Sequence, residues 1–107
     1  MNSFEQMESV IAQRRAEPQE GSYTCYLFDK GLDKILKKVG EECAETIIAA
    51  KNGDKKELVG EINDVFYHIM VMMNECGVTL QDVCEEMDVR AQKIGNLKKF
   101  HVSDHNT

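Results

Sequence analysis

Hydrophobic and polar residues alternate along this chain with the period of α-helices. Between positions 32 and 52, apolar residues recur at intervals of three and four, at Leu36, Val39, Cys43, Ile47 and Ala50. The same spacing runs from position 54 to 77 through Leu58, Ile62, Val65, Ile69, Met72 and Cys76. Stripes with this period predict two long amphipathic helices. Asn52-Gly53 separates them so briefly that we expect an antiparallel helical hairpin.

Capping signals mark two further helices, one at each side of this hairpin. Ser3 with Gln6 predicts a first helix that ends before Pro18, and Thr79 with Asp82 predicts a last one. The segment AEPQEGSYT predicts a linker, and no segment shows the alternation of a β-strand. The sequence therefore predicts an all-α fold of four helices in one domain, residues 1–107. Residues 95–107 are expected to form a flexible tail.

Composition and charge exclude several classes of protein. The net charge of −6 argues against a nucleic-acid binder, since affinity for phosphate backbones comes from clustered Lys and Arg. The longest apolar run falls short of the roughly 18 residues of a membrane span, and no signal peptide is recognisable. The four cysteines form no C-x-x-C pair, so we interpret them as reduced core thiols of a cytoplasmic protein. A chain of this size gains buried surface from a second copy, which predicts a homodimer.

Two pairs of acidic residues lie in the middle of the long helices. Glu42 with Glu45 and Glu61 with Asp64 are three residues apart, so each pair lies on one side of its helix. If the hairpin forms, both pairs can face one groove, where unit charges about 4 Å apart repel by about 4 kcal/mol at an effective dielectric near 20. A hard divalent cation such as Mg²⁺ or Mn²⁺ relieves this repulsion. The alternative is a solvated acidic face, because other acidic pairs share the spacing.

Histidine offers little support for a different metal site. A ferritin-like di-iron bundle needs a histidine three residues after its glutamate, and neither Glu45 nor Glu61 has one. His68 lies one turn after Asp64, and we interpret it as a hydrogen-bonded structural histidine.

The segment from Ser22 to Met73 resembles the phosphoribosyl-ATP pyrophosphohydrolases of histidine biosynthesis, which belong to the MazG-like all-α pyrophosphohydrolases. The pattern E-E-x-x-E followed by E-x-x-D is met by Glu41, Glu42, Glu45, Glu61 and Asp64. A second run, SYT to GEE, extends from Ser22 to Glu42. The resemblance implies a four-helix MazG-like bundle completed by dimerisation. It also implies Mg²⁺, with Mn²⁺ able to substitute, on the last four of those acids, with Glu41 either a further ligand or the catalytic base for the attacking water.

The resemblance also implies a reaction. This is the Mg²⁺-dependent hydrolysis of phosphoribosyl-ATP, a small-molecule nucleotide, to phosphoribosyl-AMP and pyrophosphate. Lys30 and Lys38 match the family run and are expected to hold phosphate oxygens, the alternative being that they only solvate an exposed helix. Ser22, Tyr23 and Thr24 either contact substrate or cap a helix.

Two rival functions fit the same residues. A house-cleaning nucleoside triphosphate pyrophosphohydrolase would use the same metal site on another nucleotide. A non-catalytic helical interaction module would use its acidic face to bind a basic partner.

Overall fold

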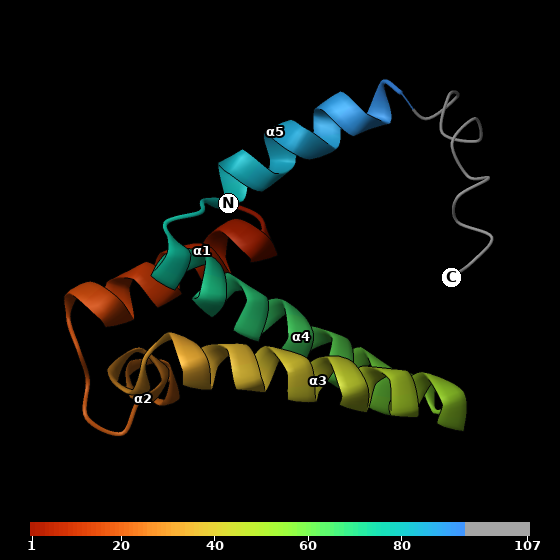
Figure 1. Ribbon diagram of the computed structural model, residues 1–107, viewed down its shortest axis with the longest axis horizontal. Helices are drawn as coiled ribbons and strands as arrows, with labels where there is room; N and C mark the ends of the chain where they lie inside the picture. The colour runs from red at the N-terminus through yellow and green to blue at the C-terminus, as the bar shows by residue number, and fades with distance from the viewer. Residues whose placement is uncertain (94–107) are drawn as a thin grey trace.

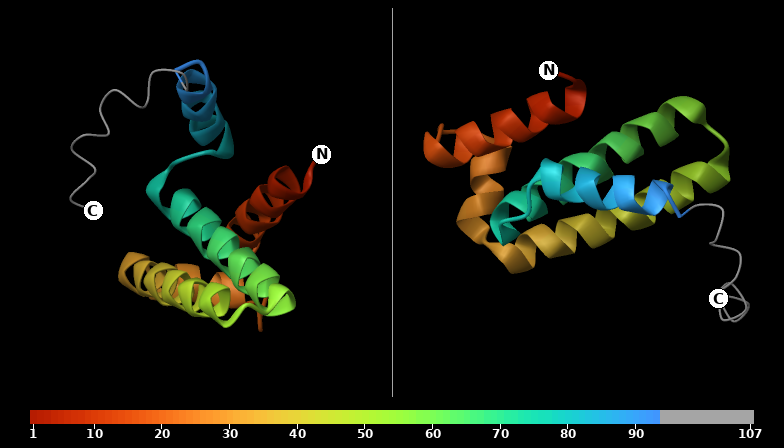
Figure 2. Two further views of the ribbon diagram at one scale, coloured as in Figure 1. Left: turned by 90° about the vertical axis from the view of Figure 1, so that its right-hand side faces the viewer. Right: turned by 90° about the horizontal axis from the view of Figure 1, so that it is seen from above.

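The computed structural model describes residues 1–93, and these form five α-helices (Figure 1). The helices are α1 (Ser3–Ala16), α2 (Tyr23–Lys30), α3 (Leu32–Asn52), α4 (Lys55–Cys76) and α5 (Leu80–Ala91). Within this range there is no β-strand, so the prediction of an all-α fold is confirmed. The predicted tail at 95–107 lies outside the described residues. Helices α3 and α4 lie antiparallel as the predicted hairpin, and α1 packs against α4 (Figures 1 and 2).

The structure has one helix more than the four predicted, because α2 forms at the end of the predicted linker, where a helix cap at Ser22 was one of two alternatives. Ser22 caps its start, and the Oγ atom of Ser22 accepts a hydrogen bond from the backbone N–H of Cys25 at 3.2 Å. Gly31 ends the helix with φ at 91°, a backbone conformation that glycine adopts without strain. At 8 residues, α2 is too short for its periodicity to stand out from the surrounding sequence.

The capping predictions are right for α5 and displaced by one residue for α1. Thr79 and Asp82 form the predicted reciprocal pair of hydrogen bonds at the start of α5. Helix α1 begins at Ser3 as expected, but the cap is Asn2 with Glu5, not the pair one residue later. The Oδ1 atom of Asn2 accepts from the backbone N–H of Glu5 at 2.9 Å. Asparagine and serine cap helices about equally well, so cap preference alone does not choose between Asn2 and Ser3.

The hydrophobic core lies at one end of the α3–α4 hairpin. It joins all of the first four helices through six buried side chains, Ile11, Leu27, Ile35, Met70, Val71 and Met73. Complete burial of such a side chain stabilises a protein by about 1.5–3 kcal/mol. The core therefore anchors α1 and α2 where α3 begins and α4 ends.

Away from this core, much apolar surface stays uncovered in the single chain. The buried residues of α3 are Ile35, Glu42 and Ala49, each one position before a residue of the predicted apolar stripe. A shift of one position turns a helix by about 100°, so the stripe faces outward, with Ile47 71% exposed and Leu36 44% exposed. Helix α5 buries no residue and projects away from the hairpin (Figures 1 and 2).

Two further findings concern the character of the helices and the state of the cysteines. None of the described helices is long and apolar enough to cross a membrane. All four cysteines are free thiols, as predicted. They are not core residues, however, because Cys43, Cys76 and Cys84 are exposed and Cys25 is half-buried.

Candidate metal centre

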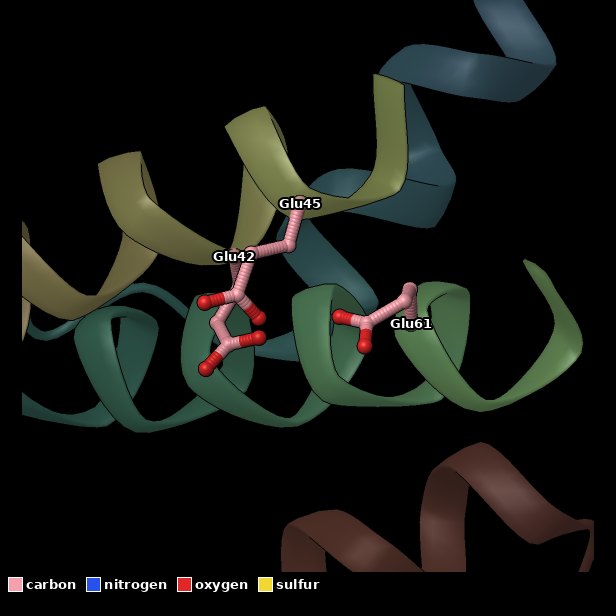
Figure 3. A group of neighbouring side chains, drawn as sticks. All are labelled: Glu42, Glu45 and Glu61. Carbon is pink, nitrogen blue, oxygen red and sulfur yellow. The ribbon is translucent and has the colours of Figure 1, made fainter. Parts of the chain in front are cut away.

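Three carboxylates meet between α3 and α4. Glu42 and Glu45 extend from neighbouring turns of α3, and Glu61 points toward them from α4 (Figure 3). One carboxylate oxygen from each of the three lies within 4.8 Å of those of the other two. The tight turn at Gly53 produces this arrangement, because it folds α4 back along α3 and brings the acidic middle of each helix into register. We call these three residues the carboxylate group.

Two oxygens of the carboxylate group are buried without a hydrogen-bond partner among the described residues. They are Oε2 of Glu42, a residue only 7% exposed, and Oε2 of Glu61. A buried polar atom without a partner costs free energy, and a charged one costs more. A bound cation supplies the missing interaction, so the residues fit a metal ion.

The electrostatics of Glu61 support the same conclusion. Its pKa lies above the ordinary value of a glutamate, first because burial disfavours the charged form, and then because of the nearby Glu45, Glu42 and Asp64. A divalent cation reverses this effect by favouring the charged carboxylates. With oxygen as the only donor type, the group suits hard ions such as Mg²⁺ or Mn²⁺.

Two predicted site residues lie outside the carboxylate group. Asp64 follows Glu61 by one turn of α4 and is exposed, although its charge helps to raise the pKa of Glu61. The Glu41 side chain is 45% exposed, with its Oε1 atom 3.4 Å from Nζ of Lys38. Both acids therefore lie around the rim of the group.

The two predicted phosphate-binding lysines have different surroundings. Nζ of Lys38 lies 3.5 Å from Oε1 of Glu42, which places this ammonium directly beside the carboxylate group. Burial, the largest single effect, lowers the pKa of Lys38, but Tyr23, Glu41 and Glu42 together raise it above its ordinary value. Lys30 instead lies over the ring of Tyr26, with Nζ 5.7 Å from the ring centroid.

A polar cluster next to the centre joins α2 to α4. His68 is 4% exposed, and its Nδ1 atom lies 2.7 Å from the backbone carbonyl oxygen of Asp64. Its Nε2 atom lies 3.0 Å from the hydroxyl of Tyr23. The prediction of a hydrogen-bonded histidine is therefore right, but its partner in α2 was not predicted. No local pattern pointed to this partner, because Tyr23 and His68 are 45 positions apart in the sequence.

The sequence compares closely with proteins of known name. The profile of the family described as phosphoribosyl-ATP pyrophosphohydrolase matches residues 4–91. A phosphoribosyl-ATP pyrophosphatase of Clostridium botulinum is 54% identical over 97 residues, covering 91% of this chain and 88% of the relative. Another from Bacillus cereus is 50% identical over 96 residues, covering 90% of each chain.

A longer relative shows the same similarity over part of its length. A histidine biosynthesis bifunctional protein of Lactococcus lactis is 51% identical over 98 residues, which is 92% of this chain and 46% of that protein. The chain thus spans less than half of the bifunctional relative, but most of the relatives named for the pyrophosphatase alone. The family match includes α2 to α5 and the carboxylate group. The chain belongs to the phosphoribosyl-ATP pyrophosphohydrolase family.

Proposed function

We propose that this protein hydrolyses phosphoribosyl-ATP to phosphoribosyl-AMP and pyrophosphate in histidine biosynthesis. The observation that supports the proposal most is the carboxylate group, in which Glu42 buries an oxygen that has no partner in the described part of the chain. Such a group lies within the region that matches a family and relatives named for this substrate. Four free thiols fit a reducing compartment, so we place the reaction in the cytoplasm.

The carboxylate group would hold Mg²⁺, or Mn²⁺ in its place, with Asp64 adding an oxygen from the rim. When bound, the ion supplies charge neutralisation at the phosphates and acidifies a coordinated water. Glu41 is solvent-accessible at the edge of the group, where a carboxylate can take the proton of an attacking water. Lys38 is close enough to the group to bind a phosphate oxygen, and Lys30 would add a second positive charge from the end of α2.

The test is pyrophosphate release from phosphoribosyl-ATP, measured beside dCTP, dUTP and ATP at equal concentrations with Mg²⁺. Of the four nucleotides, we expect only phosphoribosyl-ATP to be hydrolysed rapidly. This hydrolysis should stop when EDTA removes the Mg²⁺. Faster turnover of a nucleoside triphosphate would instead identify a house-cleaning pyrophosphohydrolase. If no nucleotide releases pyrophosphate in a metal-dependent way, the protein is a binding module and the proposal is wrong.

We further propose that the active form is a homodimer. Large apolar side chains of the hairpin remain exposed in the single chain, namely Leu36, Ile47, Ile48, Val59 and Phe66. A set of this kind marks a protein interface more often than a free surface. Ile47→Glu should therefore give a monomer in light scattering after size exclusion, while Gln13→Glu, an exposed position on α1, should stay dimeric. A dimeric Ile47→Glu protein would exclude this face as the interface.

A further inference from the structure

In the described part of the chain, Lys38 is the one residue that forms an ion pair with the carboxylate group. Its Nζ atom lies 3.5 Å from Oε1 of Glu42 and 3.4 Å from Oε1 of Glu41, which stands at the rim of the group. The two other described ion pairs involve no residue of α3. The positive charge next to the three carboxylates is therefore that of a single ammonium.

Lys38 neutralises the carboxylate group only in part. Its ammonium reaches one oxygen of Glu42, while Oε2 of Glu42 and Oε2 of Glu61 stay buried without a hydrogen-bond partner in the described structure (Figure 3). One positive charge also cannot balance the charges of three neighbouring carboxylates. A divalent cation carries twice the charge and binds several oxygens at once. The ammonium is thus the weaker of two cations that suit the same glutamate.

A cation bound to the carboxylate group would repel the Lys38 ammonium. Both would share Glu42, whose side chain is only 9% exposed, so little water screens one charge from the other. Glu41 offers the ammonium a second partner, and the Glu41 side chain is 45% exposed. Lys38 can therefore leave Glu42 and keep an acceptor on the solvent side, from which a phosphate would approach.

We propose that Lys38 is the counter-ion of Glu42 in the metal-free centre, and that binding of a divalent cation releases its ammonium to the phosphates of the substrate. The inference rests on the proposed function and adds an order of events to it. The metal and the ammonium compete for Glu42, so each weakens the binding of the other. The ammonium becomes free to bind phosphate only once the metal is in place, which couples substrate binding to metal binding.

The first experiment measures the affinity for Mn²⁺ without substrate, by isothermal titration calorimetry. Lys38→Met removes the charge, and Lys37→Met removes the charge of an exposed neighbour that pairs with no described residue. An ion pair that is partly exposed changes an equilibrium constant by up to about fivefold. We expect Lys38→Met to lower the Kd for Mn²⁺ by about two- to fivefold and Lys37→Met to leave it nearly unchanged. An unchanged or higher Kd in Lys38→Met overturns the proposal.

Lys38→Arg separates the charge of this side chain from its shape. Arginine keeps a positive charge that can pair with Glu42. The Kd of Lys38→Arg for Mn²⁺ should therefore not fall below that of the unmodified protein. A Kd as low as that of Lys38→Met would show that competition by a positive charge is not the cause, and would overturn the proposal.

The second experiment measures the affinity for pyrophosphate at a constant free Mg²⁺ concentration that saturates the centre. A hydrogen bond to a charged group changes an affinity by about tenfold or more. We expect Lys38→Met to weaken pyrophosphate binding by about this factor, although it strengthens metal binding. A residue that only supports the fold would weaken both, and one that only binds phosphate would leave the Kd for metal unchanged. Either result overturns the proposal.

Nitrogen-15 NMR of the lysine ammonium groups observes the release directly. Lys38→Arg identifies the signal of Lys38, and Mg²⁺ serves as the metal because it is diamagnetic. We expect saturating Mg²⁺ to make the Lys38 ammonium more mobile, and pyrophosphate, added next, to restrict it again. Equal mobility with and without Mg²⁺ overturns the proposal.

The same signals distinguish the failure of this inference from the failure of the proposed function. If Mg²⁺ releases the Lys38 ammonium but phosphoribosyl-ATP is not cleaved, the proposed function is wrong and the counter-ion role stands. If phosphoribosyl-ATP is cleaved while the ammonium stays in place, the reverse holds. If the unmodified protein binds neither Mg²⁺ nor Mn²⁺, both proposals are wrong.

Discussion

The two halves of α4 perform different tasks. Its last turns place Met70, Val71 and Met73 in the hydrophobic core with residues from α1, α2 and α3. Its second turn instead places Glu61 opposite Glu42 and Glu45, where carboxylates repel one another. One helix therefore stabilises the fold at one end and brings mutually repelling carboxylates together, at the proposed metal centre, at the other. The division protects the fold, since the acids can change charge without disturbing the core.

The same division is visible along α3. Its buried residues are Ile35 and Ala49 with Glu42 between them. An apolar side chain at position 42 would continue the contact with α4, but a glutamate leaves a buried oxygen without a partner. Local destabilisation of this kind is typical of sites that bind an ion or substrate.

The largest expected effect is a loss of turnover when the carboxylate group is changed. Changing Glu45→Gln removes one charge from the carboxylate group. Replacing a residue that only supports a metal ligand typically costs about 10- to 100-fold in activity. We expect the loss of a ligand to cost more, so turnover should fall by more than about a hundredfold. The helical circular dichroism signal should stay nearly unchanged. Glu57→Gln, an exposed acid of the same hairpin, is the control and should remain active. Normal turnover in Glu45→Gln would show that the group is not the site.

The next largest effect is a loss of stability when the hydrophobic core is changed. Leu27→Ala removes a fully buried side chain of α2 and should lower the free energy of unfolding by about 2–5 kcal/mol. Urea titration measures this change, and Leu32→Ala, at an exposed position, should cost under about 1 kcal/mol. Turnover per folded molecule should stay near that of the unmodified protein. A large loss of kcat in folded Leu27→Ala would mean that the two ends are coupled.

Metal binding should stabilise the protein through the carboxylate group, independently of the hydrophobic core. At free Mg²⁺ a hundredfold above its Kd, ligand linkage adds about 2.7 kcal/mol to the free energy of unfolding. We expect this increase in the unmodified protein and in Leu27→Ala, measured by thermal melting with and without Mg²⁺. In Glu42→Gln it should be absent. An equal increase in Glu42→Gln would place the ion elsewhere.

The smallest effect is a gain in stability. Because the pKa of Glu61 is raised in the folded state, its charged form destabilises the metal-free fold at neutral pH. Glu61→Gln should therefore melt at a slightly higher temperature than the unmodified protein at pH 7 without metal. The advantage should disappear in acid, where the carboxyl is protonated whether folded or unfolded, and should reverse in Mg²⁺. A lower melting temperature at pH 7 would show that the negative charge is not disfavoured there.

Short-range signals allowed the sequence to indicate most helix ends and the acidic residues of the candidate site. Asp54 accepts hydrogen bonds from two backbone N–H groups at the start of α4, and Gly53 ends α3 with φ at 78°. Such caps involve residues within a few positions of each other, so they are readable in a single sequence. The spacing of the acids likewise placed each pair on one side of its helix.

By itself, then, the sequence determined where the long helices lie and which of their residues carry charge. Only the tertiary structure decided which side of α3 packs inward, because that choice depends on all neighbouring helices at once. A difference of one position exchanged Leu36 for Ile35 and placed Glu42 in the interface with α4. The bond from Tyr23 to His68 likewise spans 45 positions and required α2, a short helix that joins the core through Leu27. Contacts between distant residues leave no local periodic signal, so folding had to bring them together.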